Sequence, residues 1–235
     1  MTSGFHTAGT AAGGFDAILR RLFDIAVALL GIVLFLPLAI PVLLAVRLDS
    51  PGPVFFSQHR LGQHGRLFRL YKFRKFHVSA AAGRAVTLKG DDRMTRVGRI
   101  LERTKIDEVP QLWNVLKGDM AIVGPRPETL DFADCFEGPF RAVLDHRPGL
   151  FGPNQVHFRN ECALYPEHGD PHAFYREVLF PAKARIDLDY FPRRSLGQDM
   201  AWLVRGVLAV LAMGLPTRRR PERPGAAEDC PSMPE

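Results

Sequence analysis

An uncharged apolar stretch near the N-terminus constrains the fold of this chain more than any other feature. It runs from Ile25 to Val46, 22 residues without Asp, Glu, Lys or Arg. As a straight α-helix it would be about 33 Å long at about 1.5 Å per residue, enough to cross the hydrocarbon core of a bilayer. It is too long for the apolar region of a secretory signal, and no small-residue cleavage site follows it. The sequence therefore predicts a membrane helix over residues 21–48.

Two features favour a helix that enters and leaves the membrane on the same side. Arg21 precedes the stretch and Arg47 follows it, so the positive-inside rule puts both ends in the cytoplasm. Pro37 and Pro41 each remove a helix hydrogen bond, which should bend the helix near its centre. We therefore predict a re-entrant helix that breaks at Pro37. A buried core helix and a kinked spanning helix are the alternatives.

Charge is concentrated in the segment that follows the apolar stretch. The net charge of the 235 residues is +6, but Val54–Lys105 alone carries 13 Lys and Arg against three acids. Such a block predicts an anionic partner, which could be nucleic acid, phospholipid head groups or a phosphorylated substrate. The cysteines, at positions 135, 162 and 230, are scattered without a C-x-x-C pair. This spacing argues against a disulfide framework or a cysteine zinc site and favours a reducing compartment.

Local patterns predict a mainly helical α+β chain with a short β-hairpin. Apolar runs at Val54–Phe56 and Leu67–Phe73 flank a turn-like Leu61–Gly65, which is typical of a hairpin. The remaining expectations are helix, loop and helix over 91–116, a strand or turn over 121–123, helical spacing over 129–145, a loop over 147–155, a helix over 170–188 broken near Pro181, and an apolar helix over 195–215 in the core or the membrane interface. We also expect residues 1–20 to be mobile and residues 216–235 to be disordered.

Two adjacent carboxylates, Asp107 and Glu108, stand just before Pro110. Neighbouring side chains on a helix point about 100° apart, so the two acids can serve two different atoms. A proline is accommodated in the first turn of a helix, which places the pair at a helix N-terminus. There the helix dipole stabilises acids without any function, and this is the simplest interpretation. The same position could also hold a phosphate or a carboxylate-bound metal ion.

Three arginines in loops favour a functional role for the acidic pair over helix stabilisation alone. Arg126 lies between Pro125 and Pro127, Arg147 precedes a Pro-Gly pair, and Arg159 lies in a further loop. A fixed backbone presents the planar guanidinium group in one orientation, which suits phosphate oxygens. The common nucleotide-binding loops and the zinc-protease motif are absent from the sequence.

The ordered series of motifs resembles the bacterial sugar transferase family, the small monotopic phosphoglycosyl transferases. The likeness runs from about residue 21 to residue 205. The residues that carry it are Gly52–Phe56, Gln58–Gly62, Phe68, Tyr71–Arg74, Asp92–Thr95, Gly98, Asp107–Met120 and Val123–Glu128.

The resemblance implies a reaction and roles for individual residues. Such enzymes transfer a sugar 1-phosphate from a UDP-sugar to a polyprenol phosphate and release UMP, with Mg²⁺, at the cytoplasmic face of the bacterial inner membrane. It implies that Asp107 is the nucleophile and that Glu108 helps to hold the metal. The other residues expected to bind substrate phosphate or nucleotide are Lys72, Arg74, Arg126, Arg147 and Arg159. Residues 49–215 would form the cytoplasmic catalytic domain, with interfacial amphipathic helices.

The expected partners are a UDP-sugar, a polyprenol phosphate and inner-membrane lipids, with no nucleic acid and with a homodimer as an option. Two other classes of protein stay open. A membrane-tethered nucleic-acid binder would explain the basic, aromatic segment. A non-enzymatic scaffold for polysaccharide assembly would explain the membrane helix.

Three stretches depart from the family pattern. The family usually continues Lys-Phe-Arg with Thr or Ser and then Met, whereas Lys75 and Phe76 stand here. The stretch before the acidic pair is commonly doubly basic, but Glu102 precedes Arg103. Residues 152–159 lack the expected tryptophan and second glycine.

Overall fold

One long helix, α1 (Gly9–Asp49), forms the N-terminal part of the protein. The computed structural model describes residues 9–78, 91–166 and 168–212. Residues 1–8 and the predicted disordered tail lie outside the described residues. The helix begins ahead of residue 21, where we expected the membrane segment to start. The run DAILRRL just before that segment consists mostly of good helix formers, which explains the extension.

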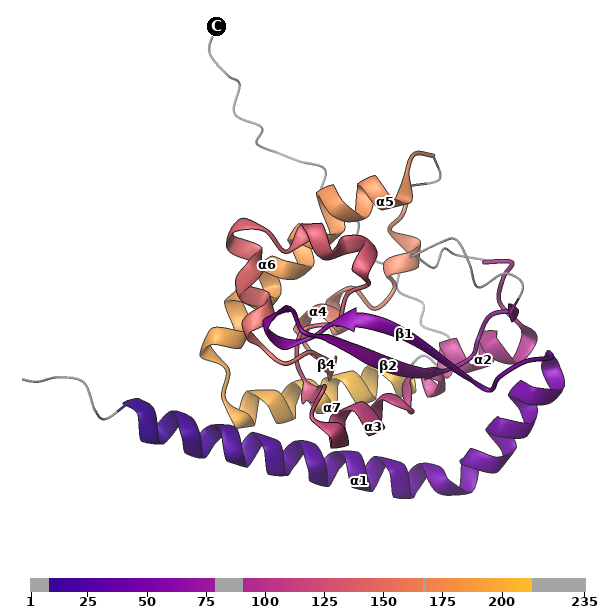
Figure 1. Cartoon of the computed structure of the whole chain (residues 1–235), viewed down its shortest axis with the longest axis horizontal. Coiled ribbons are helices and arrows are strands. Elements are labelled where there is room, and N and C mark those ends of the chain that lie inside the picture. The colour runs from indigo at the N-terminus through magenta and orange to yellow at the C-terminus, as the bar shows by residue number, and fades with distance from the viewer. Residues whose placement is uncertain (1–8, 79–90, 167, 213–235) are drawn as a thin grey trace, which may run out of the picture.

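The helix is bent rather than straight. Pro37 and Pro41 both lie inside α1, and Figure 1 shows its C-terminal end turning up toward the rest of the protein. Proline is a frequent cause of such a bend because it removes a hydrogen bond and crowds the preceding turn. By length and composition, Gly14–Asp49 is able to cross a membrane.

The predicted hairpin is confirmed. Strands β1 (Phe55–Leu61) and β2 (Leu67–Phe73) pair antiparallel, with Phe55 opposite Phe73 and Leu61 opposite Leu67. The first strand is longer than its apolar run, because it continues through the polar residues up to Leu61. Gln58 and Arg60, which share one face of the strand, line a cavity, so polar residues interrupt the apolar pattern without ending the strand.

The rest of the protein is mainly helical, as expected. The other helices and strands are α2 (Arg96–Thr104), α3 (Gln111–Lys117), β3 (Ala121–Val123), β4 (Gly149–Phe151), α4 (Pro153–His157), α5 (Pro171–Phe174), α6 (Phe180–Tyr190) and α7 (Leu196–Ala212). Short 3₁₀ helices occur at η1 (Gln63–Gly65), η3 (Ile106–Glu108), η4 (Leu130–Cys135), η5 (Gly138–Asp145), η6 (Glu161–Ala163) and η8 (Phe191–Arg193), and η7 (Tyr175–Leu179) is a π-helical turn. Pro181 lies in the first turn of α6, directly after this π turn. The helix predicted to break near Pro181 is therefore irregular there but continuous, because Phe174, Leu179 and Phe180 keep right-handed helical dihedral angles.

Two segments differ from expectation. Residues 129–145 form the 3₁₀ helices η4 and η5 instead of a continuous helix. The expected loop over 147–155 contains β4, which pairs in parallel with β3, and most of α4. This pairing depends on glycine, because a Cβ atom at Gly149 would lie 2.1 Å from the backbone nitrogen of Gly124. No alternation of apolar and polar residues marks such short strands in the sequence.

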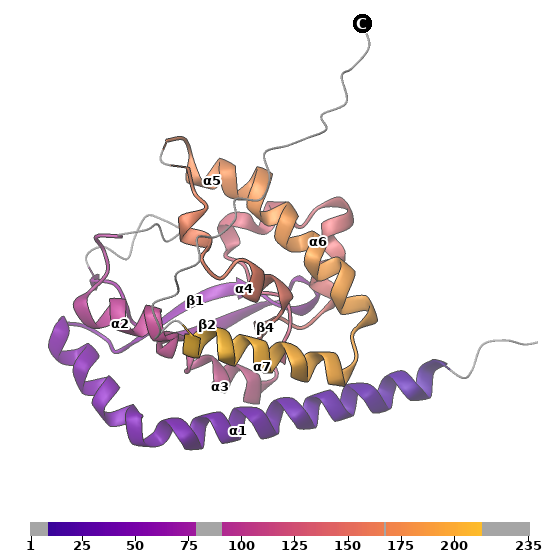
Figure 2. The same cartoon turned by 180° about the vertical axis from the view of Figure 1, so that it is seen from behind.

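The domain packs in layers above α1. Figures 1 and 2 both show α3 and α7 next to α1, the hairpin above them, and α5 and α6 farthest from α1. The central core joins these layers through buried side chains such as Ala28 of α1, Leu70 of β2 and Val115 of α3. A second cluster, including Phe132 and Phe180, lies under α5 and α6.

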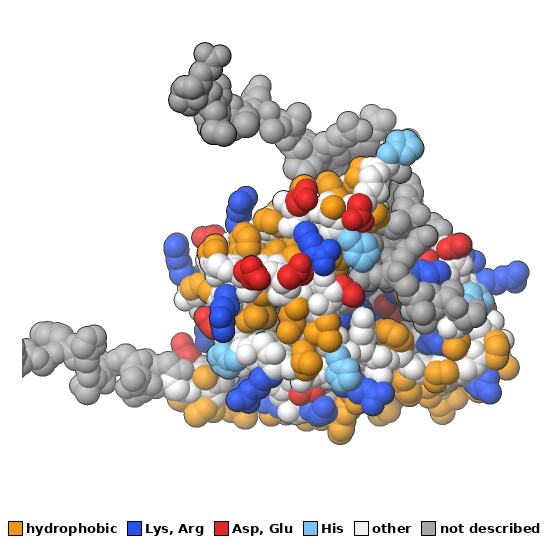
Figure 3. All heavy atoms as spheres, turned by 45° about the horizontal axis from the view of Figure 1, so that its top comes forward, with side chains coloured by type: hydrophobic (Ala, Val, Ile, Leu, Met, Phe, Trp, Pro, Cys, Tyr) orange, Lys and Arg blue, Asp and Glu red, His pale blue; other side chains and the backbone are white. Residues whose placement is uncertain are grey.

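One side of α1 is packed and the other is open. Large apolar side chains along the helix remain exposed, among them Leu30, Leu34, Leu38 and Ile40. Hydrophobic side chains gather along the lower edge of the molecule in Figure 3, whereas charges of both signs cover the face above. The alternative of a buried core helix is therefore wrong, because a core helix would have this face covered.

Candidate active site

A large cavity of about 1320 Å³ opens between the bent end of α1, the hairpin, α2, α4 and α7. Apolar side chains of α1 and α7, such as Leu34 and Val207, line one part of it. Charged side chains from the hairpin, from η3 and from the segment after β3 line the other part. The cavity therefore suits a ligand with both an apolar portion and an anionic portion.

The acidic pair lines this cavity from the turn between two helices. Asp107 and Glu108 belong to η3, and Lys105 before them has a positive φ of 59°, which ends α2 and reverses the chain. Pro110 follows as the residue that caps α3. The pair thus lies one turn ahead of the regular helix, close to the predicted helix N-terminus. The turn is supported from below, since Ile106 and Val109 pack against α1.

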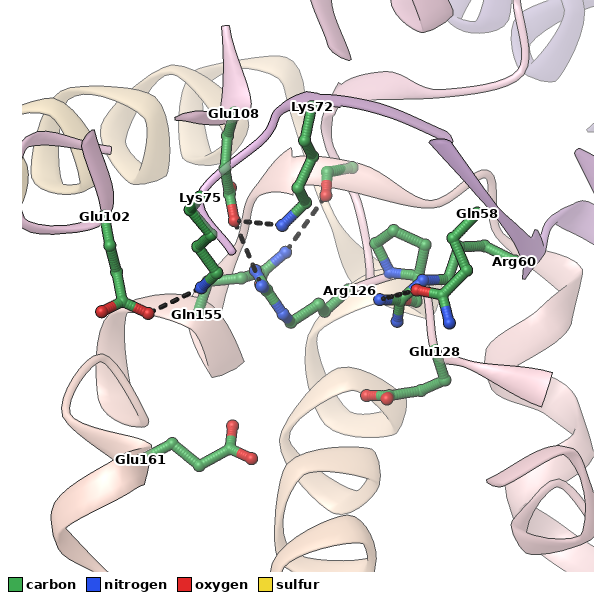
Figure 4. A network of polar contacts seen from close by, with 12 residues as sticks. Gln58, Arg60, Lys72, Lys75, Glu102, Glu108, Arg126, Glu128, Gln155 and Glu161 are labelled. Atoms are coloured by element: carbon green, nitrogen blue, oxygen red, sulfur yellow. Dashed lines mark hydrogen bonds and ion pairs between the residues drawn. The ribbon is translucent and has the colours of Figure 1, made fainter. Parts of the chain in front are cut away.

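Glu108 is held by two cations. Lys72 Nζ of β2 lies 2.9 Å from Glu108 Oε1, and Arg126 Nη2 lies 3.2 Å from the same oxygen. Figure 4 shows the side chains of Lys72, from β2, and Arg126, from the segment after β3, both pointing to Glu108. Burial alone would raise the pKa of Glu108, but Lys72 and Arg126 outweigh it and hold that pKa well below the usual range. Glu108 is therefore ionised.

The same network shifts the pKa values of both cations. Burial lowers the pKa of Lys72 to about 8, although the charge of Glu108 opposes the shift. The charge of Glu108 raises the pKa of Arg126. Lys72 is therefore the one of these two partners that can lose its proton near physiological pH.

Asp107 is in a different environment from its neighbour. Its side chain is 2% exposed, and its Oδ1 atom makes no hydrogen bond within the described residues. Burial raises the pKa of Asp107, the charge of Lys72 lowers it, and burial is the stronger effect. Adjacent carboxylates with opposite pKa shifts are typical of a site where one acid reacts and the other carries charge.

The expected magnesium ion would need ligands from a substrate as well as from the acidic pair. No group of three His, Cys, Asp or Glu side chains converges within residues 9–78, 91–166 and 168–212. Magnesium commonly takes one or two carboxylates and completes its shell with substrate phosphates and water. Glu108 fits this role, because both of its cation contacts use Oε1, and the unpartnered Oδ1 of Asp107 is nearby in the chain.

Two of the arginines expected to bind phosphate, Arg74 and Arg147, are placed differently from the others, although Arg74 does line the cavity. Arg74 points away into the C-terminal end of α1, where all five of its donors are engaged by oxygens of the segment 46–53. It has no donor left for a phosphate. Arg147 is not among the cavity-lining residues of the described chain, and its backbone oxygen lies against Gly124. The sequence shows a basic residue but not the direction of its side chain, so phosphate binding by Arg74 and Arg147 stays a prediction.

Arg159 does line the cavity, together with Lys72 and Arg126. The structure therefore brings together Asp107 and Glu108 with these three basic residues.

A second polar cluster lines the cavity and was missed in the sequence. Lys183 Nζ of α6 lies 3.1 Å from Glu161 Oε2 and 3.5 Å from Glu128 Oε1, and it also donates to the Tyr175 hydroxyl at 2.9 Å. Figure 4 shows Glu128 and Glu161 on the far side of Arg126 from Glu108. Glu128 ends a motif that carries the family resemblance, but Lys183 lies in an ordinary helical pattern, so only the fold reveals the group.

Comparisons with known proteins agree on one family. The family model described as bacterial sugar transferase matches residues 15–213. A Caulobacter vibrioides protein, UDP-glucose:undecaprenyl-phosphate glucose-1-phosphate transferase, is 37% identical over 196 residues, which are 82% of this chain and 69% of that protein. An Aeromonas hydrophila protein, UDP-N-acetylgalactosamine-undecaprenyl-phosphate N-acetylgalactosaminephosphotransferase, is 45% identical over 146 residues, 60% of this chain and 34% of that protein. The Salmonella typhimurium undecaprenyl-phosphate galactose phosphotransferase is 36% identical over 82% of this chain and 40% of its own length. This chain thus spans between about a third and two thirds of these relatives.

Proposed function

Because this chain belongs to the bacterial sugar transferase family, we propose that it transfers a sugar 1-phosphate from a UDP-sugar to a polyprenol phosphate and releases UMP. One observation supports this reaction above the alternatives. The buried acid pair and three basic residues share a cavity with an apolar wall made by the membrane helix. A nucleic-acid binder or a scaffold has no use for a buried carboxylate whose pKa is raised.

In the proposed first step, Asp107 acts as the nucleophile. One of its carboxylate oxygens forms a bond to the β-phosphorus of the UDP-sugar, while the bond from that phosphorus to the bridging oxygen breaks. UMP leaves with the bridging oxygen and its electron pair. In the second step, a phosphate oxygen of the acceptor attacks the same phosphorus, and the Asp107 oxygen departs and regains its negative charge.

Glu108 and its cations prepare the site for a diphosphate. The anionic Glu108 keeps Lys72 and Arg126 in place, and both cations can turn toward substrate phosphate oxygens that arrive beside it. Arg159, in the turn that follows α4, would approach the same phosphates. We propose that Glu108 is also a ligand of Mg²⁺, which would neutralise phosphate charge and so favour attack by a carboxylate.

The acceptor would reach this site from a membrane in which α1 is re-entrant. Both ends of the apolar segment of α1 are fastened to the same domain, since Arg21 donates to the carbonyl oxygen of Val115 at 2.7 Å and Asp49 accepts from the backbone of Val97 at 2.9 Å. The exposed apolar face of α1 supports placement in lipid. We propose that the domain lies on the cytoplasmic face of the inner membrane, where Arg21 and Arg47 favour that side.

The test is UMP release by the full-length protein purified in detergent. UDP-glucose, UDP-galactose and UDP-N-acetylgalactosamine would each be supplied with Mg²⁺, with and without undecaprenyl phosphate. We expect UMP from at least one donor and, before any lipid is added, a sugar-phosphate mass on a peptide containing Asp107. Lack of UMP with every donor would contradict the transferase function. UMP that forms only with lipid, with no adduct after a rapid quench, would contradict the covalent step alone and favour Asp107 as a base.

A further inference from the structure

Two residues that depart from the family pattern meet at the cavity wall. Lys75 Nζ lies 2.6 Å from Glu102 Oε1, although the residues are 27 positions apart in the chain. Both line the cavity, and their side chains are 17% and 34% exposed. The Lys75 ammonium group can therefore contact a ligand in the cavity without any change in the protein backbone. The proposed catalytic steps described above do not use it.

The backbone of Lys75 is fixed by α2. Its carbonyl oxygen accepts from Thr95 N at 2.9 Å, and a Cβ atom at Gly98 would lie only 2.1 Å from that same oxygen. Glycine at position 98 thus allows the first turn of α2 to press against the chain at Lys75. The side chain is held at its other end by Glu102 of the same helix. The ammonium group is therefore positioned from both ends.

Lys75 lies where the charged and apolar parts of the cavity meet. Phe73, two residues earlier, packs against Phe35 of α1 with ring centroids 5.8 Å apart. On the other side, Asp107 lines the same cavity as Lys75. Figure 4 shows the Lys75 side chain pointing into the space shared with Glu108 and Arg126. The group thus lies between the membrane helix and the proposed nucleophile.

Lys75 has donor capacity left, in contrast to Arg74, whose five donors are all engaged. An ammonium group has three N–H donors, and the contact with Glu102 uses one of them. Lys75 can therefore stay bonded to Glu102 while it donates to a phosphate oxygen. Arg103, also of α2, lines the same part of the cavity and adds positive charge.

A phosphate that carries a long apolar chain fits this location best. Its chain would lie along α1 and α7, and its head group would meet Lys75 before it meets Asp107. The diphosphate of a UDP-sugar has no apolar portion, and Arg126 and Arg159 offer it a polar wall. We propose that Lys75, positioned by Glu102, binds the phosphate monoester of the polyprenol acceptor. This inference rests on the proposed two-substrate reaction and names the residue that receives its second substrate.

The experiment compares Michaelis constants for the two substrates in Lys75→Gln. We expect KM for undecaprenyl phosphate to rise about tenfold, the effect of losing one charge-assisted contact. KM for the UDP-sugar and the yield of UMP without lipid should stay near wild type. Arg96→Gln is the matched control, because Arg96 is an exposed basic residue of α2 that does not line the cavity. Its two KM values should not change.

Glu102→Gln tests whether the pair binds a ligand or only stabilises the fold. Glutamine can still accept from Lys75 but removes a negative charge beside the phosphate, so KM for the lipid should not rise. An increase equal to that of Lys75→Gln would overturn the proposal, since it would show that the ion pair acts as a structural unit. A rise in KM for the UDP-sugar in Lys75→Gln would overturn it in favour of a donor phosphate site. Absence of UMP from the wild-type protein would instead contradict the proposed function itself.

Discussion

At the scale of single residues, Asp107 combines two properties that oppose each other. Its side chain is almost fully buried, which disfavours the ionised form, yet a nucleophilic carboxylate must be ionised to react. In the proposed reaction, burial would also remove the water that weakens attack of the carboxylate on phosphorus. On this proposal, burial of Asp107 lowers the stability of the fold and favours reactivity, as is common at active sites.

Replacement of Asp107 by Asn tests this balance. The amide keeps the shape of the side chain but is no nucleophile, so turnover should fall to background. Because the buried charge is removed, the melting temperature in detergent should stay the same or rise by a few degrees, at about 2–4 °C per kcal/mol for a chain of this size. Differential scanning fluorimetry and UMP release on the same sample would measure both effects. A melting temperature several degrees lower would mean that Asp107 stabilises the fold, which would contradict the expected cost of its burial.

The pH dependence should reveal Lys72. Protonation of Asp107 removes the nucleophile, so the rate should rise with pH through a pKa that lies above the usual range of aspartate. The pKa of Lys72 is about 8, so its positive charge is present below that pH and is lost above it, and the rate should then fall. In Lys72→Arg the alkaline decline should disappear, because arginine stays charged. The measurement is kcat/KM for the donor between pH 5 and 10, and an unchanged decline in the variant would exclude Lys72 as its cause.

Residue types were easier to predict than residue directions. Asp107, Glu108 and Arg126 stand in motifs whose order in the chain is specific, and the structure brings them into one cavity. Arg74 stands in an equally specific motif, but its guanidinium group turns into α1 instead. Lys72 and Arg74 are two positions apart, so strand alternation alone would place both on the same face. The strand ends at Phe73, however, and beyond it the Arg74 side chain turns to the oxygens of the segment 46–53. Only the packing of the hairpin against α1 decides this direction.

At the scale of elements, Arg74 connects the hairpin to the membrane helix. It donates to the carbonyl oxygens of Ser50 and Pro53 at 2.8 Å and 2.6 Å, and to the Ser50 hydroxyl at 2.8 Å. These oxygens follow the last turn of α1, where backbone carbonyl groups have no partner within the helix. The arginine thus fixes the angle at which the chain leaves α1 and enters β1. The bent arm of α1 in turn supports the turn that carries the acid pair.

The variant Arg74→Lys should weaken this connection without touching the substrates. Lysine offers three donors in place of five and cannot reach the same set of oxygens. We expect the free energy of unfolding to fall by about 2 kcal/mol, because hydrogen bonds of a charged group are lost. The melting temperature should fall by several degrees, and KM for the UDP-sugar should not change. Arg66→Lys, at an exposed position next to the hairpin turn, is the control and should melt like wild type. A selective rise in KM would restore Arg74 as a phosphate ligand.

The bounds of helices and strands could be predicted where the sequence carries strong local signals. The hairpin has glycines in its turn, and α2 begins after Thr95, whose hydroxyl accepts from Gly98 N at 2.9 Å. The parallel pair β3–β4 has no such signal, because its strands are three residues long and depend on the close approach of Gly124 and Gly149. The 3₁₀ segments in 129–145 likewise show helical spacing but lack a regular helix. Contacts distant in sequence determine these parts, and one sequence does not display them.

At the scale of the whole molecule, α1 is a surface on which the domain rests. Its packed side carries Arg20, Arg21 and Asp24, which bond to α7, α3 and β3 respectively. Its open side carries only apolar groups over most of its length, and α7 adds the exposed Val204, Leu208 and Leu211. For α7 we expected a place either in the core or in the membrane interface. One face of this helix packs in the core, and the other face is apolar and exposed. A planar apolar surface of this kind favours contact with one leaflet.

Topology decides whether this arrangement exists in a bilayer. If α1 crossed the membrane, Arg20 and Arg21 would be drawn to the side opposite the domain, and their bonds to Asp199 and Val115 would break. Such polar groups are expensive to leave unpaired at the edge of the hydrocarbon region, so the folded domain favours a re-entrant helix. We therefore expect cysteines placed at positions 10 and 60, in a background without the natural cysteines, to be protected from a reagent that stays in the periplasm. Replacing Pro37 and Pro41 together by Leu should straighten α1 and make position 10 accessible from the periplasm while position 60 stays protected. If position 10 of the protein with both prolines were labelled from outside, α1 would be a kinked spanning helix, and the contacts of Arg20 and Arg21 could not form in the membrane.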